Sequence, residues 1–430
     1  MSRVKSLASA SASILVVWLA SRIMLLGFVR HWFPYRGDAV GDVKFYHDWS
    51  KVLLHGHFPT DARWQYPPGA TLPILAPRLV PFGGYLNAFM ATALLADLVI
   101  LVALLWFGRR TGSKLGAWYW VVGLPLVGPI ALGRYDVHIT MLVVLALVVT
   151  LPRTRGFWTA LAVMVKLWPA TLVVGMNPRS RKGRGELAWT GGFIAAMVAA
   201  TVFVSHAYGF LDNQNKRGLE VEALPATPFM FFGRIGPRMG IHWHRFQGFW
   251  VKERYGSMEV VNYHADKLAR YSMALMVIAA ALLVLWWWRA RFTAATPYDA
   301  ALTATLFFVL TNKVISPQYM IWLAGIAAVC MAVKGSSQRP VALLLLLVYG
   351  LTQIEFPIRW FDIIWRHQPW YGAGALVLRN VLLLAASVLS YVLLWRSTRR
   401  QEETAADDGA EEPPATATEQ PAALDSAGTA

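Results

Sequence analysis

Long apolar runs separated by polar segments dominate the chain. The first extends from Ala10 to Phe28 with Arg22 as its one charged residue, and the next extends from Tyr85 to Phe107. Runs of this length match the roughly 20 residues that a helix needs to cross the hydrocarbon core of a membrane. They lack the alternation of transmembrane β-strands. The pattern therefore predicts an all-α polytopic membrane protein, because backbone groups cannot remain unpaired in lipid.

Composition supports this prediction. The 430 residues are 56% hydrophobic, and the mean hydropathy is +0.44, which argues against two or three soluble domains. Cys330 is the single cysteine and lies in an apolar run. An internal disulfide framework and a multi-cysteine metal site are therefore excluded.

The net charge of +16 is unevenly distributed. Residues 401–430 hold eight of the 24 acidic residues and no Lys or Arg, so residues 1–400 carry +24. Most of the basic residues stand between apolar runs, as topology determinants do, rather than forming a nucleic-acid patch. We expect 1–400 to be one transmembrane domain and 401–430 to be a disordered, acidic, cytoplasmic tail.

Basic clusters set the expected orientation. The positive-inside rule places them in the cytoplasm with both termini. They lie at 109–114, 153–155, 179–184, 289–291, 334–339 and 396–400. The segments left on the outer side are 30–84, 132–138, 207–269, 312–319 and 356–371, which include a first outer loop (30–84) and a large outer loop (207–269).

One segment breaks this alternation. Residues 157–175 have a basic cluster at both ends but are long enough for only one crossing. We expect a broken hairpin that enters and returns, with its turn near Lys166 and its break at Pro169. Non-helical backbone at that depth requires a cavity or surrounding protein, so Lys166 is expected to face a polar cavity. The total is about ten full spans plus this hairpin, or 11–12 membrane segments.

Ionisable residues next to apolar runs are functional candidates, because charge at membrane depth is costly. Arg134, Asp136, Lys166 and Lys313 have this placement. Arg134 and Asp136 could instead form an internal ion pair that holds a kink. We interpret other charged residues of the first outer loop as a solvated surface; they are Asp48, Lys51, His55, His57 and Arg63.

The histidines of the first outer loop are candidate metal ligands. His47, His55, His57 and Asp61 would have to converge on one ion at ~2 Å. The segment from Lys51 to His57 has the pattern of a helix end, which does not bring these side chains together. We therefore expect no metal.

Six motifs in order resemble glycosyltransferase family 87, a family of membrane proteins with the GT-C architecture. They span about residues 37–320. They are Gly41-Asp42-Val43 with Tyr46 and Trp49; Trp64-Gln65-Tyr66-Pro67-Pro68-Gly69; Gly133-Arg134-Tyr135-Asp136; Lys166-Leu167-Trp168-Pro169; Arg217-Gly218-Leu219-Glu220-Val221-Glu222; and Lys313-Val314-Ile315-Ser316-Pro317-Gln318-Tyr319.

The resemblance implies an inverting transferase that uses a lipid-phosphate sugar, similar to the PimE-like α-mannosyltransferases that use polyprenyl-phosphate-mannose. GT-C enzymes place an essential acid in the first outer loop, and Asp42 matches it by position. Asp61 is the second choice. A carboxylate there would act as general base on the acceptor hydroxyl.

The same chemistry requires cations for the leaving phosphate and hydrogen-bonding side chains for the sugars. Lys313, Arg134 and Lys166 are the expected phosphate-binding residues. The expected sugar- and acceptor-binding residues are Tyr46, Trp64, Gln65, Tyr66, Asp136, His138, Glu220, Glu222, Gln318 and Tyr319. No cofactor is expected, and no Rossmann-type glycine motif for a nucleotide sugar is present.

Three alternatives stay open at this stage. The sugar could be arabinose instead of mannose. The protein could be a transporter or flippase of a lipid-linked sugar, although its polar residues cluster outside rather than along the membrane. It could also be a silent scaffold for envelope biosynthesis. On the first hypothesis it works at the outer face of the plasma membrane on a glycolipid or lipoglycan acceptor, such as a phosphatidylinositol mannoside of actinobacteria.

Overall fold

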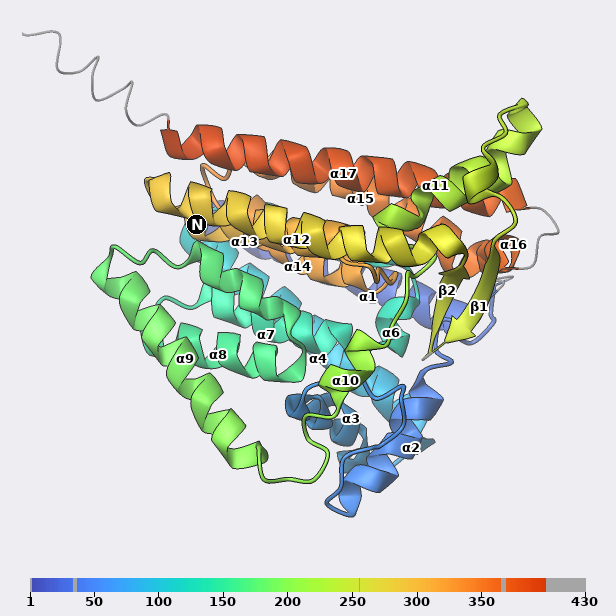
Figure 1. Ribbon diagram of the computed structural model, residues 1–430. Helices are drawn as coiled ribbons and strands as arrows, with labels where there is room; N and C mark the ends of the chain where they lie inside the picture. The colour runs from blue at the N-terminus through green and yellow to red at the C-terminus, as the bar shows by residue number, and fades with distance from the viewer. Residues whose placement is uncertain (1, 34–36, 255, 365–368, 400–430) are drawn as a thin grey trace, which may run out of the picture.

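The chain folds into a bundle of helices with a small two-stranded sheet (Figure 1). This computed structural model describes residues 2–33, 37–254, 256–364 and 369–399, so the predicted acidic tail lies outside the described residues. The α-helices are α1 (Ser2–Val29), α2 (Val43–Leu54), α3 (Thr71–Leu75), α4 (Gly84–Thr111), α5 (Leu115–Val127), α6 (Ile130–Gly133), α7 (Asp136–Val148), α8 (Pro152–Val165), α9 (Arg181–Thr201), α10 (Phe210–Asn215), α11 (Thr227–Met230), α12 (Tyr263–Arg289), α13 (Thr296–Thr311), α14 (Tyr319–Ala332), α15 (Arg339–Gln353), α16 (Trp360–Ile364) and α17 (Pro369–Arg399). The other elements used below are the strands β1 (Trp250–Arg254) and β2 (Ser257–Val261), the 3-10 helices η1 (Pro68–Ala70) and η3 (Trp168–Gly175), and the π-helices η5 (Phe231–Ile235) and η8 (Ile354–Ile358).

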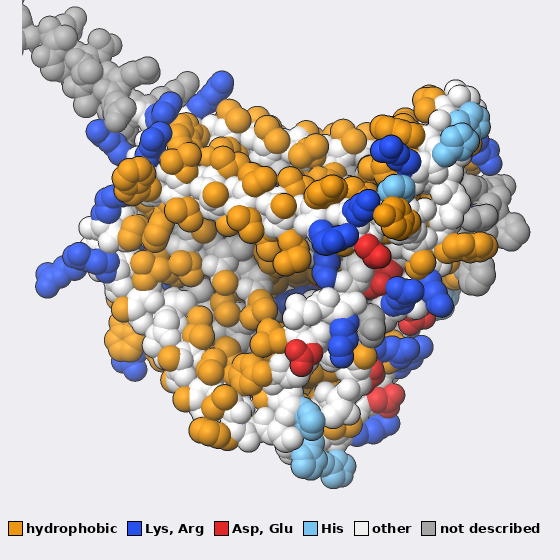
Figure 2. All heavy atoms as spheres, in the orientation of Figure 1, with side chains coloured by type: hydrophobic (Ala, Val, Ile, Leu, Met, Phe, Trp, Pro, Cys, Tyr) orange, Lys and Arg blue, Asp and Glu red, His pale blue; other side chains and the backbone are white. Residues whose placement is uncertain are grey.

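Apolar helices form the membrane part. Among the described residues, five helical segments are long and apolar enough to cross a membrane: Ser11–Val29, Gly84–Thr111, Tyr263–Arg289, Arg339–Ile358 and Trp370–Arg399. Figure 2 shows an apolar surface over the middle of two of these helices, α12 and α17, as lipid contact requires. The predicted all-α polytopic membrane fold is confirmed, whereas the number of about ten spans stays a prediction.

Helix α14 lies at the centre of the bundle. Every residue from Tyr319 to Ala332 is buried, and the helix packs against α5, α7, α13 and α15. A helix that is apolar all round is expected to be surrounded by protein or lipid. Here protein surrounds it, and its first residue lies where the loops gather.

The loops predicted to be outside gather at one end of the bundle, which we name the loop end. In Figure 1, α2, α16 and the two strands lie at this end, on the right. The N-terminus and the last residues of α12 and α17 lie at the opposite end. Segments that are far apart in the sequence are therefore placed side by side.

The predicted broken hairpin is present. Helix α8 ends at Val165, Lys166 is extended, and η3 follows. The chain returns along η3, because α9 begins beside the start of α8: an added Cβ on Gly156 would lie 2.6 Å from Cβ of Trp189, and Arg155 pairs with Glu186 at 3.5 Å. Both basic flanks thus lie at the same end, and Lys166 is at the tip.

Among the described residues, the strands lie in the large outer loop. Strands β1 and β2 pair antiparallel, with Lys252 opposite Glu259. Glu220 forms an isolated bridge to the same Glu259. Val260 of β2 is buried, and β-branched residues such as valine suit a half-buried strand. This short sheet holds the Arg217–Glu222 segment against the bundle.

The charged residue within the first apolar run has a buried partner. Arg22 is 2% exposed and donates from Nε and Nη2 to both oxygens of Asp97, each at 2.8 Å. The indole nitrogens of Trp18 and Trp120 donate to the same carboxylate at 2.7 Å. The ion pair links α1 to α4 and satisfies the carboxylate fully.

The Tyr-Pro-Pro-Gly motif packs on the hairpin tip through its glycine. An added Cβ on Gly69 would lie 2.5 Å from the carbonyl oxygen of Met164, a backbone atom that cannot move alone. Gly69→Ala is therefore expected to destabilise the protein by about 1–3 kcal/mol through overpacking and to lower activity by displacing Tyr66 from Lys166.

The control for Gly69→Ala is Gly192→Ala in the exposed part of α9, where an added Cβ meets nothing within 4 Å. It should be neutral or stabilise by up to about 1 kcal/mol. Denaturation in detergent micelles measures both variants. Equal stability of the two variants would contradict the close-packing argument.

Candidate active site

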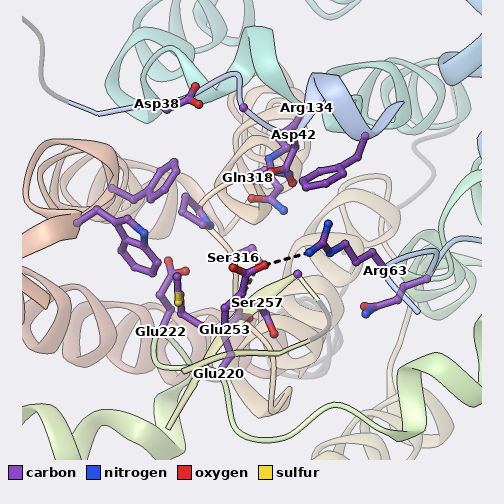
Figure 3. A pocket seen from close by; sticks show the side chains of 18 of the residues that line it. Asp38, Asp42, Arg63, Arg134, Glu220, Glu222, Glu253, Ser257, Ser316 and Gln318 are labelled. Carbon is purple, nitrogen blue, oxygen red and sulfur yellow. Dashed lines mark hydrogen bonds and ion pairs between the residues drawn. The ribbon is translucent and has the colours of Figure 1, made fainter. Parts of the chain in front are cut away.

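A cavity of about 520 Å³ opens at the loop end (Figure 3). Its lining comes from the first outer loop, the α6–α7 turn, the hairpin tip, the large outer loop, and the outer segments 312–319 and 356–371. The polar and charged lining residues are Asp38, Asp42, Lys44, Arg63, Gln65, Arg134, Lys166, Gln214, Arg217, Glu220, Glu222, Glu253, Ser257, Ser316 and Gln318. Asp42, Arg134 and Gln318 group on one side, with Glu220, Glu222 and Ser316 opposite them.

Asp42 combines access with a fixed position. It precedes α2, whose N-terminal dipole favours a carboxylate there, and it forms an ion pair with Arg134. The side chain of Asp42 is 36% exposed, against 16% for Arg134. Gly133 allows the α6–α7 turn to lie close to the backbone of the first outer loop, because an added Cβ would lie 2.1 Å from the carbonyl oxygen of Ala39. The carboxylate is held in place by its ion pair and is reachable from the cavity.

Lys166 lines the cavity, as the sequence predicted. Its Nζ donates to Oδ1 of Asp136 at 2.9 Å, and the indole nitrogen of Trp322 donates to the same oxygen at 2.6 Å. Four aromatic rings lie around the ammonium, with Trp322 at 4.8 Å and Tyr319 at 5.4 Å from ring centre to Nζ. Asp136 is buried below it, so the ammonium is the part of the pair that a ligand meets.

The proposed kink-holding pair of Arg134 with Asp136 is therefore not the arrangement found. Each residue pairs with a different segment: Arg134 with Asp42 of the first outer loop, and Asp136 with Lys166 of the hairpin. The α6–α7 turn thus joins two predicted site residues that are separated by more than a hundred positions.

Arg217 is a cavity residue that sequence reasoning did not place among the cations. Its Nη1 donates to Oε1 of Gln65 at 2.8 Å, and its Nη2 lies 3.8 Å from Glu220. Its Nε is buried without a hydrogen-bond partner. Lys313 lies behind it and donates to the Arg217 carbonyl at 2.5 Å. Lys313 therefore supports Arg217, and it does not line the cavity.

Two glutamates form the opposite wall. Glu220 accepts from Oγ of Ser316 at 3.4 Å, while its Oε2 is buried without a partner. Glu222 is 2% exposed, and burial beside Glu355 and Glu220 raises the pKa of its carboxyl well above the usual range. The raised pKa favours the protonated form of this carboxyl, and that form can donate a hydrogen bond.

Behind Glu222 lies a buried arginine that the sequence analysis missed. Arg379 of α17 is fully buried, 3.2 Å from Glu355 and 3.9 Å from Glu222. Its Nη2 also donates to the backbone carbonyl of Glu222 at 3.1 Å. An arginine within the last long apolar run was the available signal, because such residues are rare in spans without a partner.

Aromatic side chains complete the cavity. Phe45, Trp49 and Tyr66 come from the first outer loop, and Tyr319 stacks on Trp322 with ring centres 3.9 Å apart. Phe356, Trp360 and Phe361 add a wall from the last loop. Flat aromatic faces beside paired carboxylates and amides suit a sugar ring.

Several predicted site residues lie outside the cavity lining. Trp64 and Tyr46 are buried behind Tyr66 and Trp49 in an aromatic cluster. His138 is buried beside Phe89, with both ring nitrogens lacking partners. Asp61 lies at the surface, where it accepts from the Arg63 amide at 2.9 Å. Of the two candidate bases, only Asp42 lines the cavity.

The histidines of the first outer loop do not converge on an ion. Within the described residues, no group of three or more His, Cys, Asp or Glu side chains is placed to hold a metal. His55 bonds to the Lys51 carbonyl at 2.8 Å, and Lys51 pairs with Asp48 at the surface. The solvated-surface interpretation fits these contacts.

Glu220 predicts a pH dependence of stability. Burial raises its pKa from 4.5 to about 7, against the opposing effect of Arg217. The folded state then binds this proton more tightly than the unfolded state does. Its contribution to stability is present below pH 4.5 and is lost as the pH rises to about 7. We expect Glu220→Gln to flatten this decline in the unfolding midpoint.

Thermal unfolding of both forms across this pH range measures the effect. The half-exposed Glu253 on the cavity rim gives the control Glu253→Gln, which should keep the parental slope. An unchanged slope in Glu220→Gln would assign the pH dependence elsewhere.

Comparison with known proteins supplies the family. Curated proteins give no significant match to this chain. The family model for glycosyltransferase family 87 matches residues 64–317, more than half of the chain. The match covers the Trp-Gln-Tyr-Pro-Pro motif, the hairpin tip and the Arg217–Glu222 segment, which together line much of the cavity. The chain therefore belongs to glycosyltransferase family 87, and it is a membrane glycosyltransferase.

Proposed function

We propose that the protein transfers mannose, with inversion, from a polyprenyl phosphate to a hydroxyl of a glycolipid or lipoglycan. The observation that carries this proposal is the pairing of Asp42 with Arg134 at the edge of a cavity rich in cations and aromatic rings. An α-1,2-mannosyltransferase of phosphatidylinositol mannoside or related envelope synthesis is the specific form of the proposal. Arabinose is the closest rival sugar.

Asp42 acts as the general base. The acceptor oxygen attacks the anomeric carbon as its proton passes to the Asp42 carboxylate. The bond from that carbon to the phosphate oxygen breaks, and its electrons stay on the phosphate. A single displacement inverts the configuration, so one catalytic carboxylate suffices, in contrast to a double displacement. Arg134 orients the carboxylate through their ion pair.

The leaving phosphate is stabilised by the cavity cations. Arg217 and Lys166 line a partly enclosed cavity, where such charges act more strongly than in water. Arg217 offers a planar fork for phosphate and Lys166 a point charge. Lys313 contributes through the backbone of Arg217. The sequence predicted that Arg134 and Lys313 bind the phosphate directly. We now propose that Arg134 positions Asp42 and that Lys313 positions Arg217.

The sugars are held by the remaining lining residues. Gln65, Glu220 and Gln318 supply hydrogen bonds, and Tyr66 and Tyr319 supply ring faces. Burial raises the pKa of Glu222, which favours the protonated form as a hydrogen-bond donor to the sugar. The proposed reaction requires no metal or cofactor, because Arg217 and Lys166 supply positive charge for the leaving phosphate.

We propose that the reaction takes place at the outer face of the plasma membrane. Basic clusters at 109–114, 334–339 and 396–399 flank the ends of helices away from the cavity, and the positive-inside rule assigns that end to the cytoplasm. Both termini are then cytoplasmic, and the loop end is extracytoplasmic.

Product analysis tests the proposal. Purified protein is incubated with polyprenyl-phosphate-mannose, polyprenyl-phosphate-arabinose and a panel of glycolipid acceptors, and products are identified by mass spectrometry and linkage analysis. A mannosylated glycolipid with inverted anomeric configuration supports it. Arabinose transfer alone would replace the sugar, and movement of the donor lipid across proteoliposomes without a new glycosidic bond would favour a flippase.

A further inference from the structure

A compact projection extends from the loop end between η5 and β1. We name residues 231–249 the aromatic projection. Its tip, 238–245, has the sequence Arg-Met-Gly-Ile-His-Trp-His-Arg, and every one of these residues is exposed. Met239 is 63% and Trp243 49% exposed. Large apolar side chains at an exposed tip are unusual in a solvated loop, so the tip needs a partner surface.

The base of the projection is packed. Phe232 contacts Trp243 and Phe246, with ring centres 4.6 and 5.7 Å apart. Arg234 lies 4.8 Å from the ring centre of Phe249 and donates to the Ile363 carbonyl at 3.4 Å. These contacts hold the tip in a defined direction, and they leave Met239, Ile241 and Trp243 facing outward.

The position of the projection identifies what lies beneath its tip. Helix α11 and η5 pack on α17, which contains the candidate span Trp370–Arg399. In Figure 1 the projection rises beyond α17 at the loop end, to the side of the bundle rather than along it. The exposed apolar face of α17, with Leu378, Val381 and Val388, is the face available to lipid. The tip therefore overhangs the bilayer surface next to α17.

The charge of the projection is one-sided. Residues 223–252 contain no Asp or Glu, whereas the tip carries Arg238, Arg245, His242 and His244. Figure 2 shows blue, pale blue and apolar side chains together on this part of the molecule. Basic residues interleaved with Trp and Ile are typical of segments that lie in the membrane interface.

We propose that the tip of the aromatic projection inserts into the headgroup region and binds anionic phospholipids. Trp243, Ile241 and Met239 enter the boundary between headgroups and acyl chains. Arg238 and Arg245 pair with lipid phosphates, and this attraction weakens with salt. The surface is distinct from the cavity, and its occupant is the bilayer itself.

Depth-dependent quenching tests the proposal. Cys330 is fully buried and is the one cysteine of the chain, so His242→Cys creates a single accessible thiol for an environment-sensitive fluorophore. The labelled full-length protein is placed in nanodiscs of phosphatidylcholine, or of an equal mixture with phosphatidylglycerol, each containing a chain-quenching spin-labelled lipid. The matched control is Lys252→Cys, on an exposed position of β1.

We expect quenching at 242 to be several-fold stronger with phosphatidylglycerol, to fall with added salt, and to be absent at 252. Arg238→Gln with Arg245→Gln should remove the lipid dependence while leaving the unfolding midpoint unchanged. Quenching that is equal in both lipids and unaffected by these substitutions would overturn anionic recognition. A label at 242 that stays solvated in both nanodiscs, or becomes shielded only when another protein is present, would overturn the proposal altogether.

Discussion

Asp42→Asn is expected to reduce sugar transfer by roughly 10²–10⁴-fold, the usual contribution of a positioned general base. The amide keeps the shape of the side chain and its contact with Arg134, but it cannot accept the proton of the acceptor hydroxyl. The loss should appear in kcat, because Asp42 acts during the displacement rather than in binding the donor. Transfer from polyprenyl-phosphate-mannose to a glycolipid acceptor measures it.

Asp61→Asn is the matched control. It lies in the same loop and makes the same change of chemistry, but its side chain bonds to the Arg63 amide and does not line the cavity. It should retain nearly full activity. Full activity of Asp42→Asn would remove Asp42 as the base, and a loss confined to Asp61→Asn would transfer the role to the second candidate.

Asp97→Leu is expected to destabilise the protein by about 3–5 kcal/mol, because it leaves the buried guanidinium of Arg22 without its carboxylate. Trp18 and Trp120 lose their acceptor in the same substitution. The site lies between two spanning helices, where water cannot replace the missing oxygens. Chemical denaturation in detergent micelles, or protein yield where unfolding is irreversible, measures the effect.

Two further variants separate charge burial from side-chain loss. Arg22→Met with Asp97→Leu removes both charges and should recover much of the lost stability, since a buried pair can often be replaced by apolar residues. Asp48→Leu breaks the exposed pair with Lys51 and should cost no more than about 1 kcal/mol. An Asp97→Leu variant as stable as the parent would show that the pair contributes nothing.

The sequence predicted much of the architecture because membrane insertion constrains it strongly. Residues 157–175 have a basic cluster at each end, so the segment must enter the membrane and return to the same side. Helix α8, Lys166 and η3 form this hairpin. The expectation that Lys166 faces a cavity followed from the cost of non-helical backbone in lipid. Motif order also separated Asp42 from Asp48 and Asp61, neither of which lines the cavity, whereas Asp38 lines it as well.

Residue partners could not be predicted, because they depend on distances across segments that are remote in sequence. Lys313 and Arg217 were both visible as cations, but only their packing shows that Arg217 lines the cavity and Lys313 stands behind it. Glu355 and Arg379 lie outside the six motifs, so nothing linked them to Glu222. The aromatic residues Trp64 and Tyr46 were indistinguishable by type from Tyr66, which is the ring that reaches the cavity.

The wall made by Phe356 and Trp360, with Arg379 behind Glu222, has a consequence for biosynthesis. A chain is synthesised and inserted from its N-terminus, so Asp42, the hairpin and the large outer loop all reach the membrane before this wall does. In the newly made protein, the cavity beside Asp42 would stay open on one side until α17 has been inserted. Premature termination before residue 355 would thus yield a membrane-inserted protein whose cavity lacks one wall and cannot enclose a sugar.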